Sequence, residues 1–163
     1  MKYIQIPEIL FSGKRSLPWK EVEKYLSRYS GSTIDVLETK DRIQIGSHFA
    51  SEYCGSVYTK KLHGTVEKAK ANAVQIIPEL IKNATNRRWI ENKDEKHRND
   101  AKGGWYRYDV FFTLSISFAE RVSRNYYKGT IVARINDCGI FLHDIINIKK
   151  EDSKPFESKD RTV

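Results

Sequence analysis

Residues 85–109, TNRRWIENKDEKHRNDAKGGWYRYD, hold a dense group of side chains that could act on a phosphate. Arginine and lysine bind phosphate oxygens, histidine exchanges protons near neutral pH, and aromatic rings stack on unpaired bases. Between positions 82 and 108, eight Lys or Arg and four Asp or Glu give a net charge of +4, half that of the chain. The candidate residues are Arg87, Arg88, Trp89, Lys96, His97, Arg98, Trp105, Tyr106, Arg107 and Tyr108.

Each of these residues also has an ordinary structural interpretation. His97, in the run DEKHRND, could be a solvated loop histidine. Arg87 and Arg88 could lie at the end of a helix, where the helix dipole favours cations. The two tryptophans of the segment could anchor a core, which is their commoner role. Lys60 and Lys61, in the loop before a long predicted helix, are typical surface charges that could also reach a phosphate.

The sequence favours chemistry without a metal or a cofactor. It has no carboxylate cluster or His-x-Asn-His pattern suited to magnesium or zinc, and no glycine-rich nucleotide loop. Cys54 and Cys138 are isolated, as reduced structural thiols usually are. His143 precedes Asp144, but adjacent residues of a strand point to opposite faces, so these two cannot orient one another.

The pattern of apolar residues predicts helices first and a sheet afterwards. Apolar side chains at helical spacing indicate two helices, and Pro78 should kink or break the second one. Strict alternation near the C-terminus indicates long antiparallel strands in a meander. The expected elements are a helix over 18–29, a hairpin over 34–45, a loop over 46–64, a helix over 65–84 and strands over 105–118, 126–135 and 140–150.

This order of elements predicts an α+β domain whose helices pack on one face of a curved sheet. The other face is then left open. Arg107, Thr113, Ser115 and Arg134 are expected on that open face, where a phosphate backbone could lie.

The length of the chain limits the number of domains, and its charge indicates the kind of binding partner. The 163 residues suit one domain, expected over 17–151, with a lead-in segment over 1–16 and a polar tail over 152–163. A net charge of +8 attracts polyanions, of which nucleic acid is the commonest. No apolar run approaches the roughly 20 residues of a membrane helix, and the first ten residues lack the plan of a signal peptide. We therefore expect a cytoplasmic protein with no membrane partner.

Four stretches give the chain a resemblance to a known family: KKLHGTVEKAKANA, PELIKNATNRRWIENKDEKH, GWYRYD and LHDIINIKKE. They resemble, in the same order, a domain found in phages and integrative elements of Firmicutes, at the end of large polyvalent proteins and phage-head-type proteins. The likeness runs from about Leu17 to Glu151. It resembles the nuclease group that includes barnase, EndoU, colicin and RelE-like proteins, whose plan is helices followed by a four-stranded sheet.

The resemblance implies metal-independent RNA cleavage, in which the 2′-hydroxyl attacks the neighbouring phosphate with help from an acid, a base and cations. It implies His97, Arg88 and Arg107 as catalytic residues, with no cofactor. The remaining candidates would bind RNA: Lys60, Lys61, Arg87, Lys96, Arg98, Trp105, Tyr106 and Tyr108. The family commonly has tyrosine at the position of His143 and an acidic residue at that of His48, so neither histidine is assigned a role.

Two other functions fit the sequence. A small basic protein of a mobile element could bind a nucleic acid or a host protein without catalysis, for example as an inhibitor of a host defence complex. It could also be a structural accessory domain of a larger polyvalent protein. The sequence leaves the RNA, the partner chain and the oligomeric state open.

Overall fold

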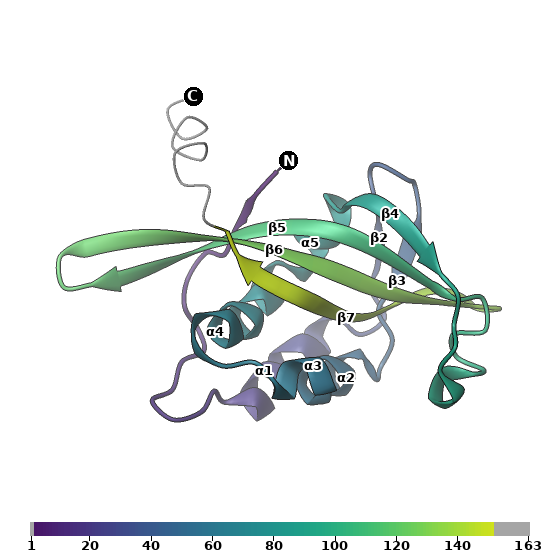
Figure 1. Cartoon of the computed structure of the whole chain (residues 1–163), viewed down its shortest axis with the longest axis horizontal. Coiled ribbons are helices and arrows are strands. Elements are labelled where there is room, and N and C mark those ends of the chain that lie inside the picture. The colour runs from purple at the N-terminus through teal and green to yellow at the C-terminus, as the bar shows by residue number, and fades with distance from the viewer. Residues whose placement is uncertain (1, 152–163) are drawn as a thin grey trace.

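The computed structural model describes residues 2–151, within which seven strands form one curved sheet (Figure 1). The strand order is β1-β5-β6-β7-β3-β2, and β4 also pairs with β5. The strands are β1 (Ile4–Gln5), β2 (Thr33–Asp35), β3 (Arg42–Gln44), β4 (Thr85–Ile90), β5 (Trp105–Phe118), β6 (Arg121–Asn136) and β7 (Gly139–Lys150).

The long strands β5, β6 and β7 form the middle of the sheet and pair antiparallel in chain order. On one side, β1 and β4 pair with different lengths of the same β5 edge, β1 in parallel and β4 antiparallel. On the other side, β3 runs parallel to β7 but pairs only with Ile140 and Phe141. Beyond these two residues, that edge of β7 carries no strand in the described chain.

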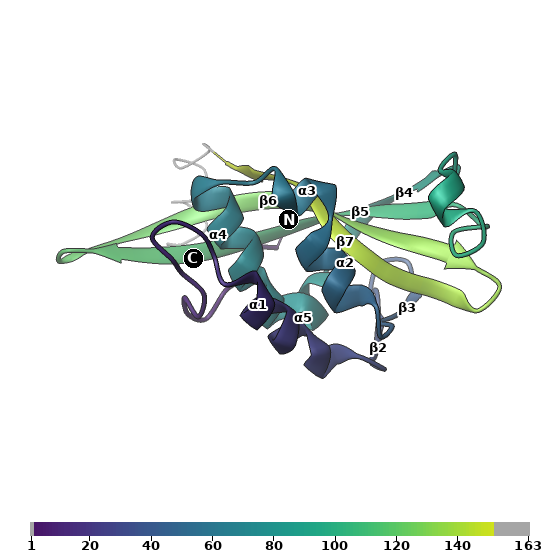
Figure 2. The ribbon, with the colours of Figure 1, turned by 90° about the horizontal axis from the view of Figure 1, so that it is seen from below.

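The α-helices of the described residues lie on one side of the sheet (Figure 2). This arrangement confirms the expected α+β architecture with helices on one face. The helices are α1 (Trp19–Leu26), α2 (Phe49–Gly55), α3 (Val57–Lys60), α4 (Gly64–Asn72) and α5 (Ile77–Lys82), with 3-10 turns at Ser27–Tyr29, Ala73–Ile76 and Glu95–His97. None of them, within residues 2–151, is long and apolar enough to cross a membrane.

The long predicted helix is divided just before Pro78. A 3-10 turn, Ala73–Ile76, separates α4 from α5, and Pro78 falls in the first turn of α5, where its missing N–H is not needed. The last residue of α4, buried Asn72, binds the N-terminal segment. Its side chain accepts from the N–H of Leu10 and donates to the carbonyl of Phe11.

Alternation along β5 assigns one face of the sheet to the core. Tyr108, Val110, Phe112 and Leu114 are buried and pack beneath the helices, and the residues between them point to the other face. An ion pair is buried in the same layer, because Lys70 of α4 places its Nζ 2.8 Å from Asp144 Oδ1 of β7. The second oxygen of this carboxylate has no hydrogen-bond partner.

Several expected elements need correction. The stretch expected as a loop over 46–64 contains α2 and α3, because Phe49 and Tyr53 supply an apolar helical stripe that the core buries. The sheet is larger than a hairpin and a three-stranded meander, since β1 and β4 extend it. The lead-in segment contributes β1 and the buried side chain of Ile6 to the domain. The expected polar tail, 152–163, lies outside the described residues.

Candidate functional site

A groove of about 1010 Å³ lies beside the free part of the β7 edge. The helices α2 and α3 pack against β7 where β3 no longer pairs with it, and they form one wall. The residues that follow β4 form another wall, and the faces of β5, β6 and β7 opposite the core form the floor. The floor residues are Trp105, Arg107, Val132, His143 and Ile146.

The second wall belongs to residues 91–104, here called the connector, which is folded by its own polar side chains. The Asp94 side chain caps the short 3-10 turn by accepting from the N–H of Lys96. Asn92 donates to the carbonyl of His97 and accepts from the indole N–H of Trp105. These bonds fix the end of β4, the 3-10 turn and the start of β5 to one another.

The far end of the connector is attached to β6. Asn136 donates to the carbonyl of Asp100, and the N–H of Gly103 donates to the carbonyl of Ile135. Gly104 has a φ of +93°, a conformation that favours glycine, and it lets the chain enter β5. The connector is therefore held at both ends, and its histidine has a defined place.

His97 projects from the connector toward the floor of the groove. Its Nδ1 lies 3.0 Å from a carboxylate oxygen of Asp100. Its ring meets the ring of Trp105 edge to face, with centroids 5.2 Å apart, and meets the ring of His143 at the same separation. His143 also packs on Trp105, with centroids 5.0 Å apart. The three rings form one cluster at the junction of connector and sheet.

A β-bulge sends His143 into the groove. Val132 pairs with Asp144, whereas the next residue, Ala133, pairs with Leu142, so His143 is the extra residue between them. The side chains of Leu142 and Asp144 are buried on the core side, and His143 faces the opposite way. The prediction that His143 and Asp144 do not act on one another holds.

His143 instead contacts charged residues from α2 and β6. Its Nδ1 lies 3.5 Å from Glu52 Oε2 and 3.3 Å from a guanidinium nitrogen of Arg134. Arg134 also binds Glu52 at 3.0 Å, and its Nε is 4.0 Å from Asp100. Burial opposes ionisation of Glu52, but the hydrogen bond from His143 and the charge of Arg134 outweigh it, so the pKa of Glu52 lies below its usual value.

Arg107 is the cation of the floor, and no group among residues 2–151 binds its side chain. Its Nε is buried and has no hydrogen-bond partner, and no ion pair of the described residues includes its guanidinium. Buried donors are rarely left unsatisfied, because the lost hydration costs about 1–3 kcal/mol. An anion in the groove would satisfy this donor.

The formal charges of the groove lining balance when the histidines are neutral. Three cations face three anions: Lys93, Lys96 and Arg107 against Glu52, Glu91 and Asp94. The net positive charge of positions 82–108 is therefore not carried over to the lining of this groove. Local geometry around Arg107, and protonation of the two histidines, decide how well an anion binds there.

The structure brings four of the predicted site residues together in the groove. These are Lys96, His97, Trp105 and Arg107. Arg88 lies directly across from Arg107 in the β4–β5 pairing, but it binds Asp109 at 2.9 Å and lies outside the groove lining. It is a neighbour of the site and no part of its wall.

Three other predicted residues lie on the opposite face of the sheet. Arg87 binds Asp41 at 2.8 Å and covers the ring of Tyr106 at 4.4 Å. Tyr108 is fully buried and donates its hydroxyl proton to Asp41. The prediction that Tyr108 contacts RNA was wrong, because its side chain is buried. Alternation along β5 places the even-numbered residues on the core side of the sheet.

The remaining predicted residues are on the surface away from the groove lining. Lys60 ends α3 and Lys61 follows it, and both are exposed. Arg98 forms an exposed ion pair with Glu95 within the connector. Neither cysteine joins the site either: Cys54 is buried, which raises the pKa of its thiol to about 12, and Cys138 is exposed.

Three residues of the site were missed or set aside at the level of sequence: Glu52, Asp100 and His143. Arg134 was expected on the open face of the sheet, but its ion pair with Glu52 was not. Asp100 follows His97 by three residues, a spacing that a short turn could bring together, and this was an available signal. Glu52 lay in a stretch expected to be a loop, and no local pattern connects it with β7. No group of three or more His, Cys, Asp or Glu within residues 2–151 is arranged to hold a metal ion.

Comparison with known proteins returns no match to a family model, to a curated protein or to a solved structure.

Proposed function

We propose that the groove is the active site of a metal-independent endoribonuclease. One observation carries the proposal: two histidines from distant parts of the chain, His97 and His143, are in contact in one groove, and each has a carboxylate at its Nδ1. Arg107, whose side chain has no partner in the part of the chain that the structure describes, faces the same space. Acid, base and phosphate-binding cation are the groups that cleavage by a 2′-hydroxyl needs.

The carboxylates define which nitrogen of each imidazole can act. When His97 carries its proton on Nδ1, it donates to Asp100, and Nε2 is left as the acceptor of a proton. A protonated His143 can donate Nδ1–H to Glu52, whose negative charge offsets that of Arg134 beside the same nitrogen, and keep a second proton on Nε2. We therefore assign His97 as the general base and His143 as the general acid.

The reaction is an intramolecular displacement at phosphorus. His97 takes the proton of the ribose 2′-hydroxyl, whose oxygen forms a bond to phosphorus, while the bond from phosphorus to the 5′-oxygen breaks. His143 gives its proton to that leaving oxygen. The products are a 2′,3′-cyclic phosphate and a 5′-hydroxyl end. Arg107 binds the non-bridging oxygens, on which negative charge increases in the transition state.

The resemblance to the phage-associated domain and its nuclease group supports the same activity through His97 and Arg107, and we add His143, to which the resemblance gives no role. Arg134 has a positioning role in this scheme, because it contacts Glu52, His143 and the neighbourhood of Asp100 at once. Arg88, earlier assigned to catalysis, would act only through its neighbour Arg107.

The test is incubation of the purified protein with labelled RNA in excess EDTA, beside DNA of the same sequence. We expect RNA fragments that end in a 2′,3′-cyclic phosphate and intact DNA, because DNA lacks the attacking hydroxyl. RNA that is bound but not cut would overturn the catalytic proposal and favour the non-catalytic binding module.

A further inference from the structure

Exposed apolar side chains gather at the mouth of the groove. Seven large apolar side chains among the described residues are well exposed, and three of them line this one groove. They are Val57 at 62%, Tyr58 at 45% and Ile90 at 36% exposure. Two come from the first turn of α3 and one from the end of β4. Exposed apolar side chains that are grouped together often mark a binding surface, whereas single ones are normal.

Tyr58 is the aromatic ring of this group, and it has no partner in the described chain. No hydrogen bond, ion pair or ring contact of Tyr58 exists there, whereas Trp105, deeper in the groove, is covered by two histidines. The Ser56 side chain caps α3 by accepting from the N–H of Thr59, so the backbone that carries Tyr58 is fixed. Its backbone is fixed, and its exposed ring is open to a ligand.

We infer that the mouth of the groove binds an unpaired nucleobase, and that the substrate is therefore single-stranded RNA. This inference rests on the proposed function. Every base has a flat apolar face that stacks on an aromatic ring, but a duplex hides these faces in its interior. Tyr58 and Val57 on α3, with Ile90 at the end of β4, would receive the base, while Arg107 on the floor binds the phosphate.

The size of the groove agrees with a segment of RNA chain. Its volume of about 1010 Å³ is at the upper end of the roughly 300–1,000 Å³ of ordinary small-molecule sites. A single base would leave much of this space unfilled. A base at the mouth and its phosphate on the floor, with the sugar between them, would use its depth.

The test separates base binding from cleavage by using an RNA that cannot react. A fluorescent 2′-O-methyl oligonucleotide lacks the attacking hydroxyl, and its affinity can be measured by anisotropy both as a single strand and as a duplex. We expect the parent to prefer the single strand. Tyr58→Ala should weaken single-strand binding about ten-fold, and Tyr58→Phe should retain it, since the ring and not the hydroxyl stacks.

Val122→Ala is the matched control, because Val122 is a 72% exposed apolar residue far from the groove lining. It should bind like the parent. Equal affinity for duplex and single strand, or no effect of Tyr58→Ala, would overturn the inference even if the parent cleaves RNA. Single-strand binding that depends on Tyr58 without cleavage of ordinary RNA would retain the inference and reject the catalytic function. Absence of any binding would reject both.

Discussion

The imidazole of His97, on the connector, meets the imidazole of His143, on the bulge of β7, with ring centroids 5.2 Å apart. Two elements far apart in sequence thus deliver the two proton-transferring groups of the proposed site. Trp105 fixes their relative position, because both rings pack against its indole.

Replacing either histidine should abolish most of the activity. His97→Ala and His143→Ala are each expected to lower the rate of RNA cleavage about 100-fold or more, the usual effect of losing a general acid or base. Circular dichroism should show a folded chain in both. His63→Ala is the matched control, because His63 is exposed and outside the groove lining. Parent-like cleavage by His97→Ala or His143→Ala would show that the assigned roles are wrong.

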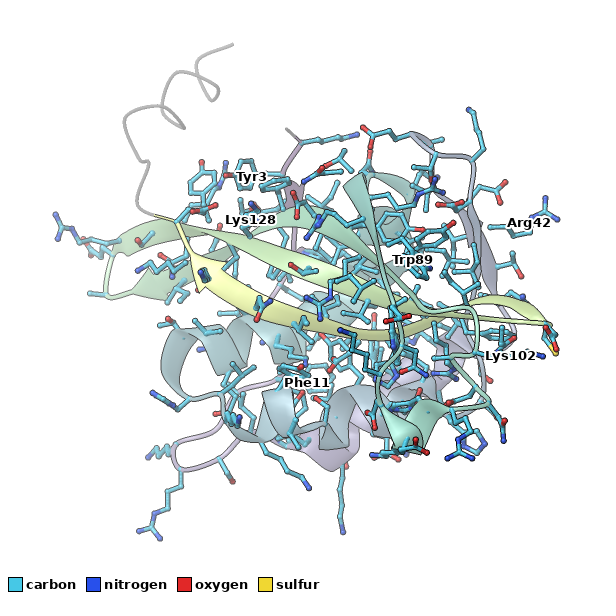
Figure 3. The ribbon with its side chains drawn as sticks, turned by 45° about the vertical axis from the view of Figure 1, so that its right-hand side comes forward. Tyr3, Phe11, Arg42, Trp89, Lys102 and Lys128 are labelled. Atoms are coloured by element: carbon cyan, nitrogen blue, oxygen red, sulfur yellow. The ribbon has the colours of Figure 1, made fainter. Side chains whose placement is uncertain are left out.

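Arg107→Ala should weaken the affinity for RNA without lowering the stability of the fold. Loss of a charge-assisted contact to phosphate is expected to weaken RNA affinity about 10-fold to 100-fold. The free energy of unfolding should not fall, because no hydrogen bond within residues 2–151 is lost and a buried donor without a partner is removed. Arg42→Ala removes an exposed arginine (Figure 3) and serves as control in the same binding and urea-unfolding measurements. A large loss of stability with unchanged affinity would make Arg107 a structural residue.

Salt dependence should reveal how few phosphates the groove contacts. Three lining cations, Lys93, Lys96 and Arg107, predict a slope of about −2 for log affinity against log salt with single-stranded RNA, from about −0.7 per contact. Lys93→Gln with Lys96→Gln should reduce the magnitude of this slope. A much steeper slope in the parent would place the main RNA contacts on the outer surface.

Acid should weaken the contribution of Glu52 to stability. The pKa of Glu52 is lower in the folded chain than its ordinary value of 4.5, so the unfolded chain takes up this proton first as the pH falls. The contribution is complete above the ordinary pKa and is lost as the pH falls through the folded value. The difference in unfolding free energy between the parent and Glu52→Gln should therefore shrink as the pH falls below the ordinary pKa of 4.5. A constant difference would contradict this.

The buried pair of Lys70 and Asp144 should be sensitive to the loss of one partner. Burial lowers the pKa of Lys70, and the charge of Asp144 counteracts this only in part. Lys70→Ala or Asp144→Ala should each cost about 3–5 kcal/mol, because one charge is left unpaired in the core. Lys70→Met combined with Asp144→Leu should recover much of the loss in urea unfolding. Single variants as stable as the parent would indicate that solvent reaches this pair.

Local sequence pattern predicts the part of the site that lies within one stretch of chain. His97, Trp105 and Arg107 could be selected together because the connector and the start of β5 are adjacent, and alternation points Arg107 away from the core. The same alternation should have excluded Tyr108. The other half depends on long-range packing, since nothing local indicates that Glu52 meets Arg134 or that a bulge separates His143 from Asp144.

The β5–β6 hairpin extends past its neighbours in the sheet (Figure 1). Among residues 2–151, the last backbone bonds to it come from Ile6 to Thr113 and from Glu151 to Tyr126, and none of these residues pairs with the outer backbone edges nearer the tip of the hairpin. Such edges can pair with a second copy of the chain. Exposed Arg121 and Arg124 near the tip place like charges wherever two tips would meet. Repulsion between these like charges would oppose such pairing, and this effect would weaken as ionic strength rises.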